Sequence, residues 1–300
     1  MKSRILFFVL TGFLGFASLI PATAQTFSSS SSAFLGSPSQ FLDITPMMKA
    51  DKLEAVSNLY MKFLDQQNMN PSDLPQFYTA AMWFGISLKD YRRALSMIQT
   101  GLDFANTFIK EGKLDCNWPN DGGVYFSRAN LLRAKAQMLA YLDEVDDAIE
   151  AANQSTSALW EIWTSPTLKK YWRDTGNGGF LTLFGQAILP VLESISRNRG
   201  EEEAAKYLPW ALSALASEGL ILDELSKGAS VPESIWLNYR RILLGHRGEA
   251  NLHVGLATEA FTILSKYPLD KSLKLNESPY LAFLFMNKSK ALTRMGRFTE

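Results

Sequence analysis

The sequence predicts an all-α protein in which antiparallel helix hairpins stack into an α-solenoid. Apolar residues recur at helical spacing along most of the chain, as at Leu131, Ala134, Met138 and Leu142. Short turns interrupt this period, as at Asp143, and helical periodicity restarts directly after them. A hairpin of this kind has apolar surface on more than one side, so packing against the next hairpin stabilises it. The repeated turns therefore favour a stack of hairpins.

Five segments carry the repeated turn. Each places an acidic, aromatic or glycine-containing turn before the start of a second helix, where a small residue allows close helix packing. The alanines at this position, Ala94, Ala148, Ala204 or Ala205, and Ala260, lie about 55 residues apart. The segments read DYRRAL at 90–95, DEVDDAI at 143–149, RGEEEAA at 199–205, GLATEAF at 255–261 and GRFTE at 296–300.

These segments resemble the turns of tetratricopeptide (TPR) repeats, over most of residues 73–300. The resemblance implies a right-handed α-solenoid, in which Tyr91 or Phe298 packs between paired helices and the following alanine marks their closest contact. Repeats of that family run about 34 residues. Since the spacing here is about 55, we describe the units as TPR-like and expect longer helices or insertions. An irregular helical bundle is the alternative.

The N-terminus has the pattern of a secretory signal peptide at residues 1–24. Lys2 and Arg4 precede an apolar run that is followed by an A-x-A cleavage signal ending at Ala24. We expect a secreted or periplasmic protein with no stable membrane anchor after cleavage; an uncleaved membrane span is the alternative. Residues 25–45 predict a flexible Ser-rich linker, and residues 46–300 a repeat domain that we expect to be cut in mid-repeat at its C-terminus.

Composition and charge narrow the class of function. With 47% hydrophobic residues the chain is globular, and its 30 basic and 30 acidic residues cancel, which disfavours nucleic acid as a partner. Cys116 is the single cysteine, so no intrachain disulfide is possible. The glycines at 176–179 lack a phosphate-loop lysine, and we expect no cofactor.

Metal binding and catalysis have little support in the sequence. His246 and His253 are seven residues apart and share a helix face near Glu249, but this spacing matches no recognised metal signature. In some enzymes a cysteine thiol and a histidine form a catalytic pair, but no sequence motif of such an enzyme flanks Cys116. We therefore expect no metal, no catalytic residue and no enzyme activity within this chain.

The resemblance implies a concave groove lined by the first helices of the pairs. Such a groove would hold an extended peptide or a segment of a partner protein, which makes an extracytoplasmic protein–protein interaction scaffold the favoured function. Amide and cationic groups suit a peptide backbone or carboxylate, whereas an ordinary solvated helix face is the alternative for each of them. By helical phase, the exposed face carries Asn130, Arg133 and Gln137 in the second copy and Asn287, Lys290 and Arg294 in the fifth.

Two other functions remain open at this stage. Glu300 falls one residue before the next expected small residue, so the helices fit the N-terminal sensory or regulatory region of a longer enzyme. A caspase-like protease of the CHAT type is one example, by family analogy alone. The other function is glycan binding through an aromatic surface around Trp118, Trp160 and Trp172.

Overall fold

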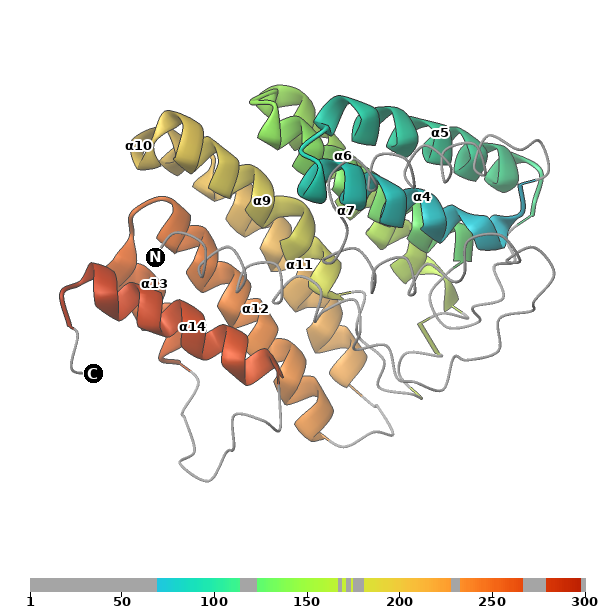
Figure 1. Cartoon of the computed structure of the whole chain (residues 1–300). Coiled ribbons are helices and arrows are strands. Elements are labelled where there is room, and N and C mark those ends of the chain that lie inside the picture. Colours follow the sequence, from blue (N-terminus) through green and yellow to red (C-terminus); the bar gives the residue numbers. More distant parts are fainter. Residues whose placement is uncertain are drawn as a thin grey trace. The chain divides into compact units, whose positions relative to one another are not determined.

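The structure is a computed structural model, and it describes residues 69–113, 123–166, 169–170, 174, 181–227, 233–266 and 279–297. Every regular element in these ranges is helical, which confirms the all-α prediction (Figure 1). The predicted signal peptide and Ser-rich linker lie outside the described residues. All of the helices below belong to one compact unit within Ala50–Glu300.

The helices follow one another as antiparallel pairs. The first pair joins α4 (Leu74–Met82), which follows a 3-10 turn, η2 (Pro71–Asp73), and continues as a π-helical segment, η3 (Trp83–Ser87), to α5 (Tyr91–Lys110). The others are α6 (Gly123–Tyr141) with α7 (Val145–Thr164), α9 (Thr182–Arg199) with α10 (Glu201–Ala205) and α11 (Leu208–Ser226), α12 (Glu233–His253) with α13 (Ala257–Leu264), and then α14 (Pro279–Arg294).

Neighbouring pairs pack in sequence order. Each first helix contacts the first helix of the next pair, in the succession α4, α6, α9, α12 and α14 (Figure 1). Each pair's second helix also contacts the next first helix, as α5 does with α6 and α11 with α12. One apolar core therefore runs through α6, α7, α9, α10, α11 and α12 without a break between pairs.

Most first helices end in the same backbone geometry. Lys89, Asp143, Gly255 and Gly296 have positive φ, from 56° to 80°. At Asp143, the N–H of Asp143 donates to the Ala140 carbonyl (3.1 Å) and the N–H of Glu144 to the Leu139 carbonyl (3.0 Å). This is the Schellman arrangement, which satisfies carbonyls left over at a helix end. The chain is thereby reversed at a fixed angle into the second helix.

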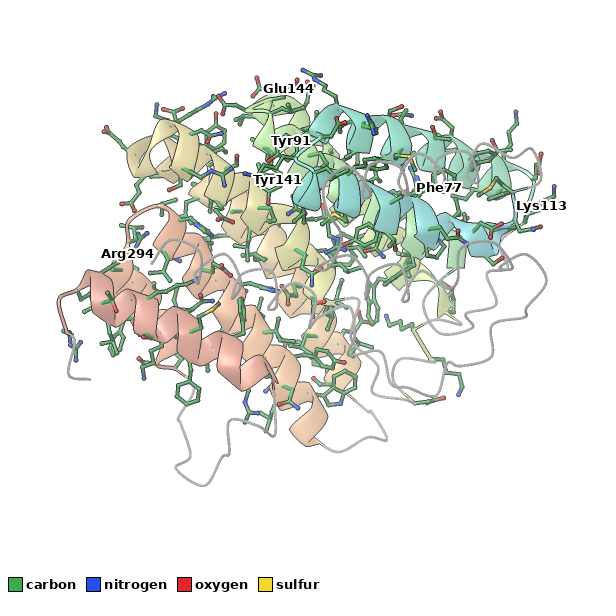
Figure 2. All side chains as sticks on the ribbon, in the orientation of Figure 1. Phe77, Tyr91, Lys113, Tyr141, Glu144 and Arg294 are labelled. Carbon is green, nitrogen blue, oxygen red and sulfur yellow. The ribbon has the colours of Figure 1, made fainter. Side chains whose placement is uncertain are left out.

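The alanines that open the second helices are buried as predicted. Ala94, Ala148, Ala204 and Ala260 are all 0% exposed, and at the third turn Ala204 rather than Ala205 fills the position. Tyr91 is half-buried and its ring lies 5.2 Å from that of Tyr141 on the next first helix (Figure 2). Tyr91 therefore connects successive pairs, whereas its packing between the two helices of its own pair stays a prediction. Phe298 lies outside the described residues.

The second helix of the third pair is not continuous. It is broken between α10 and α11 at Lys206 and Tyr207. Pro209 has no N–H to donate to the carbonyl of residue 205, but a proline fits at the start of a new helix. Pro190 within α9 has a milder effect: α9 continues through it as one helix.

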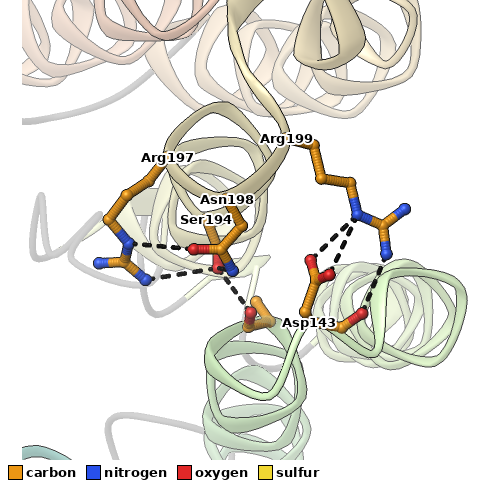
Figure 3. Close-up of polar contacts among 6 residues, drawn as sticks. Asp143, Ser194, Arg197, Asn198 and Arg199 are labelled. Carbon is orange, nitrogen blue, oxygen red and sulfur yellow. Dashed lines mark hydrogen bonds and ion pairs between the residues drawn. The ribbon is translucent and has the colours of Figure 1, made fainter.

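Ion pairs connect turns that are far apart in the sequence: two join successive pairs, and Arg294–Glu201 joins the fifth first helix, α14, to α10 of the third pair. Arg92 binds Glu144 (2.6 Å), Arg199 binds Asp143 (3.0 Å) and Arg294 binds Glu201 (2.8 Å). All are exposed to some extent, so each contributes little stability alone. Ser194 adds a buried bond, because its hydroxyl donates to the Ala140 carbonyl of the preceding first helix (2.5 Å, Figure 3).

Candidate binding surface of the first helices

Buried polar side chains concentrate on the first helices. Only Ser155 and Glu218, among the buried polar residues of the described ranges, lie on second helices. The first helices carry Ser127, Arg133, Gln137, Thr182, Ser194, Arg241, His246, Asn251 and Asn287. Their contacts with one another therefore include polar groups within an otherwise apolar interior.

Arg133 of α6 joins three consecutive first helices. Its guanidinium donates to the Tyr78 hydroxyl of α4, to Oε1 of Gln186 on α9 and to Oδ1 of Asn130 one turn earlier (3.0 Å). The guanidinium carbon also lies 4.9 Å from the centre of the Tyr78 ring, within the range of a cation–π contact. These contacts hold the side chain in one orientation.

The charge of Arg133 is buried but not neutralised by a described residue. Arg133 is 7% exposed, its known hydrogen-bond partners are all neutral, and its Nε has no partner. Removing a cation from water costs several kcal/mol unless an anion compensates it. The buried charge of Arg133 would therefore gain from an anionic group nearby.

Gln137 lies one turn further along α6 and is engaged internally. Its amide donates to the Tyr141 hydroxyl (3.0 Å), and the Arg197 guanidinium of α9 lies 5.5 Å from the Tyr141 ring. Burial raises the pKa of the Tyr141 phenol, which stays protonated at neutral pH. Gln137 and Tyr141 thus tie α6 to α9 near the turn.

On α14, Asn287 and Arg294 bind the preceding first helix. The Asn287 amide is fully buried and donates to the Gly245 carbonyl (3.3 Å), while its Oδ1 has no partner. Arg294 donates to the Leu252 carbonyl (2.6 Å) and to Glu201 (2.8 Å). Lys290 is exposed, and its ammonium forms no ion pair with a described residue.

The α12 residues opposite Lys290 have displaced pKa values. Burial raises the pKa of the Glu249 carboxyl, an effect that Lys290 opposes. Burial, together with the smaller effects of the Lys290 and Arg294 charges, lowers the pKa of His253 to about 4. His253 is therefore neutral at pH 7, and its Nε2 lies 3.8 Å from Glu249, too far for a hydrogen bond.

His246 belongs to a separate buried pair. Its Nδ1 lies 3.0 Å from Oε2 of Glu218 on α11, and both side chains are almost fully buried. The ring packs against the α9 backbone at Gly185 and meets the Phe283 ring edge-on at 5.6 Å. Within the described ranges, no group of three or more His, Cys, Asp or Glu side chains is arranged to hold a metal. Cys116 and the glycines at 176–179 lie outside them.

The six predicted binding residues form two sets, on α6 and on α14. The expectation of an exposed face is wrong for Arg133, Gln137 and Asn287, which are 7%, 4% and 0% exposed. Helix phase gave the correct face, but neighbouring first helices cover much of it. Asn130 is half-buried, whereas Lys290 and Arg294 are exposed. Binding of a partner by these residues stays a prediction.

The sequence analysis missed Tyr78 and Gln186, which complete the Arg133 cluster. They lie 55 residues before and 53 residues after Arg133, close to the repeat spacing. A search one repeat earlier and one repeat later would have found both. The predicted aromatic surface is less complete, because Trp118 and Trp172 lie outside the described residues and Trp160 is half-buried.

Comparisons with known proteins give no relative. No protein-family model matches the sequence, and neither a curated protein nor a solved structure matches it. Among the helices that the structure describes, none is both long and apolar enough to cross a membrane.

Proposed function

We propose that this chain is an extracytoplasmic binding scaffold rather than an enzyme. In this proposal its helix pairs form a right-handed TPR-like solenoid, and the first helices hold an extended peptide or a segment of a partner protein. The succession of contacts from α4 to α14 and the core shared between pairs support the stacked arrangement. The leader pattern at residues 1–24 supports a secreted or periplasmic location.

The single observation that carries this proposal is the uncompensated charge of Arg133. Nε itself is enclosed, but a carboxylate of a partner at the exposed edge of the cluster would balance the buried cation. Hydrogen bonds to a charged group contribute about 1.5–3 kcal/mol. Tyr78, Asn130 and Gln186 hold the guanidinium in place, so little side-chain entropy is lost on binding.

Lys290 and Arg294 extend the proposed surface to the last described first helix. Lys290 provides an exposed cation near the partly buried Glu249, and Arg294 is the last residue of α14. A partner segment that reaches from α6 to α14 would meet amide and cationic groups along its length. Nucleic acid is not the expected partner, because the whole chain has no net charge.

The test is affinity capture from the extracytoplasmic fraction with the full chain. We expect wild type to capture a partner protein that the double variant Arg133→Met with Gln186→Met does not capture. Lys290→Ala should capture less of it than wild type does. Lys113→Ala is the control, because Lys113 follows α5 and its ion pair among the described residues is with the nearby Glu111. If wild type, Lys290→Ala and the folded double variant captured equal amounts of the partner, the first helices would not be the binding surface.

A further inference from the structure

A groove of about 540 Å³ lies between α11 and α12, away from the residues discussed above. It is open along one side. Its lining residues come from α11 and from the middle of α12. The lining residues are Ala216, Gly219, Leu220, Leu222, Asp223, Arg240, Leu243, Leu244 and Arg247.

The lining of this groove includes several apolar side chains, one of them an exposed leucine. Leu220 is 65% exposed, more than the other large exposed hydrophobic residues of the described ranges, Leu256 (37%) and Met286 (46%). A single exposed leucine is common on protein surfaces. Here, however, Leu220 lies beside Leu243 and Leu244 in a concave site, where an entering apolar side chain would be shielded from water.

Gly219 brings the two helices close together and positions Arg247. A Cβ at Gly219 would lie 3.2 Å from Leu243 Cδ2 and 3.3 Å from Arg247 Nη2. The guanidinium of Arg247 therefore lies against the α11 backbone, at the rim of the groove. Any larger residue at 219 would push this side chain away.

The charges of the groove do not cancel. Asp223 has Arg240 as a partner at 3.8 Å, which leaves Arg247 without an ion pair among the described residues. The lining thus holds two arginines and one carboxylate, with one positive charge in excess. This excess charge favours an acidic occupant, because opposite charges steer binding and fix its orientation.

We propose that the groove binds an acidic amphipathic segment of a partner protein. The segment would insert an apolar side chain beside Leu220 and pair a carboxylate with Arg247. Arginine and a central apolar anchor are frequent in protein interfaces, and the open side suits a polypeptide better than an enclosed small molecule. This site is separate from the Arg133 cluster, because the two share no residue.

The experiment is selection of displayed random 12-residue peptides on the full chain, followed by affinity measurements on synthetic copies. We expect the selected peptides to combine apolar and acidic residues, and Leu220→Asp to weaken them about tenfold or more. Arg247→Glu should weaken them similarly and regain affinity for copies in which the acidic residues are replaced by lysine. Leu256→Asp is the control, because Leu256 is exposed outside the groove.

The charge reversal separates this proposal from other occupants. Peptides that bind Leu220→Asp and Arg247→Glu as tightly as wild type would overturn it, as would failure to recover any peptide. A wild-type dimer that Leu220→Asp converts to a monomer in analytical ultracentrifugation would assign the groove to a second copy and also overturn it. We expect the double variant Arg133→Met with Gln186→Met to bind these peptides as wild type does, so the two proposals can fail separately.

Discussion

Arg199, the last residue of α9, binds both the carboxylate and the backbone carbonyl of Asp143, which lies 56 residues earlier at the end of α6. Its Nε lies 3.0 Å and 3.3 Å from the two carboxylate oxygens, and its Nη2 lies 3.1 Å from the carbonyl (Figure 3). Asp143 itself has a φ of 62°. Asp143 thus ends the first helix α6 and binds the end of the next first helix, α9.

The left-handed conformation of Asp143 makes alanine unfavourable there. Aspartate tolerates this conformation better than alanine does, so Asp143→Ala should lower the free energy of unfolding by about 1 kcal/mol. Asp143→Gly loses the same exposed ion pair but accepts the positive φ, so it should remain closer to wild type. Urea unfolding of both variants measures the difference. Equal stability of the alanine and glycine variants would show that the backbone conformation is not what matters.

Gly185 should not tolerate a side chain. A Cβ at this position would overlap the His246 ring and separate it from Glu218, its buried partner. We expect Gly185→Ala to lower the free energy of unfolding by about 1–3 kcal/mol through overpacking. Ser196→Ala, on the same helix but only half-buried, is the control and should be nearly neutral. A Gly185→Ala variant as stable as this control would contradict the packing of His246 against α9.

The stability of the protein should fall as the pH is lowered from about 6.5 towards 4. The pKa of His253 is lowered to about 4 in the folded state, chiefly by burial, so the unfolded chain binds this proton more readily. The stabilisation is complete above the unfolded pKa of about 6.5. Its loss over this range is on the order of 2–3 kcal/mol.

Replacing His253 isolates this contribution. Glu249 acts in the opposite direction, because its raised pKa favours proton uptake by the folded state as the pH falls. Unfolding free energies at pH 7.5 and pH 4.5 should therefore be compared between wild type and His253→Gln. We expect the variant to lose less stability on acidification. Identical losses in both proteins would mean that His253 is not buried as described.

Arg133 should contribute more to binding than to stability. Replacing a buried ion and its polar partner with apolar residues of similar volume is often neutral or stabilising. The free energy of unfolding of the double variant Arg133→Met with Gln186→Met is therefore expected to lie within about 1 kcal/mol of the wild-type value or above it. Differential scanning calorimetry measures this. A loss of more than about 3 kcal/mol would assign the cluster a structural role instead.

Local patterns predicted much of the fold. Helical spacing located the pair formed by α6 and α7, and the alanine position in the repeated turns marked residues that are buried, Ala94, Ala148, Ala204 and Ala260. These features depend on residues close in sequence. The break before α11 was missed because Pro209 fits equally a kink within one helix or the start of another.

The burial of the predicted binding face could not be predicted from one helix alone. The phase of α6 placed Asn130, Arg133 and Gln137 together, but their exposure depends on α4 and α9, which cover this face from either side. Repeat spacing contained part of the missing information, since Tyr78 and Gln186 lie about one repeat away from Arg133. The Glu218–His246 pair has no such signal, because the 28 residues that separate its members match no repeat.

The stacking of successive helix pairs is the claim on which the proposed binding surface depends. Spin labels at four exposed, equivalent positions test it by double electron–electron resonance in a chain with Cys116→Ser. These positions, each two residues after a buried alanine, are Ser96, Glu150, Lys206 and Thr262. Distances measured from Ser96 should increase in the order Glu150, Lys206, Thr262. A distance from Ser96 to Thr262 as short as that to Glu150 would show pairs gathered around one centre and would contradict the stack.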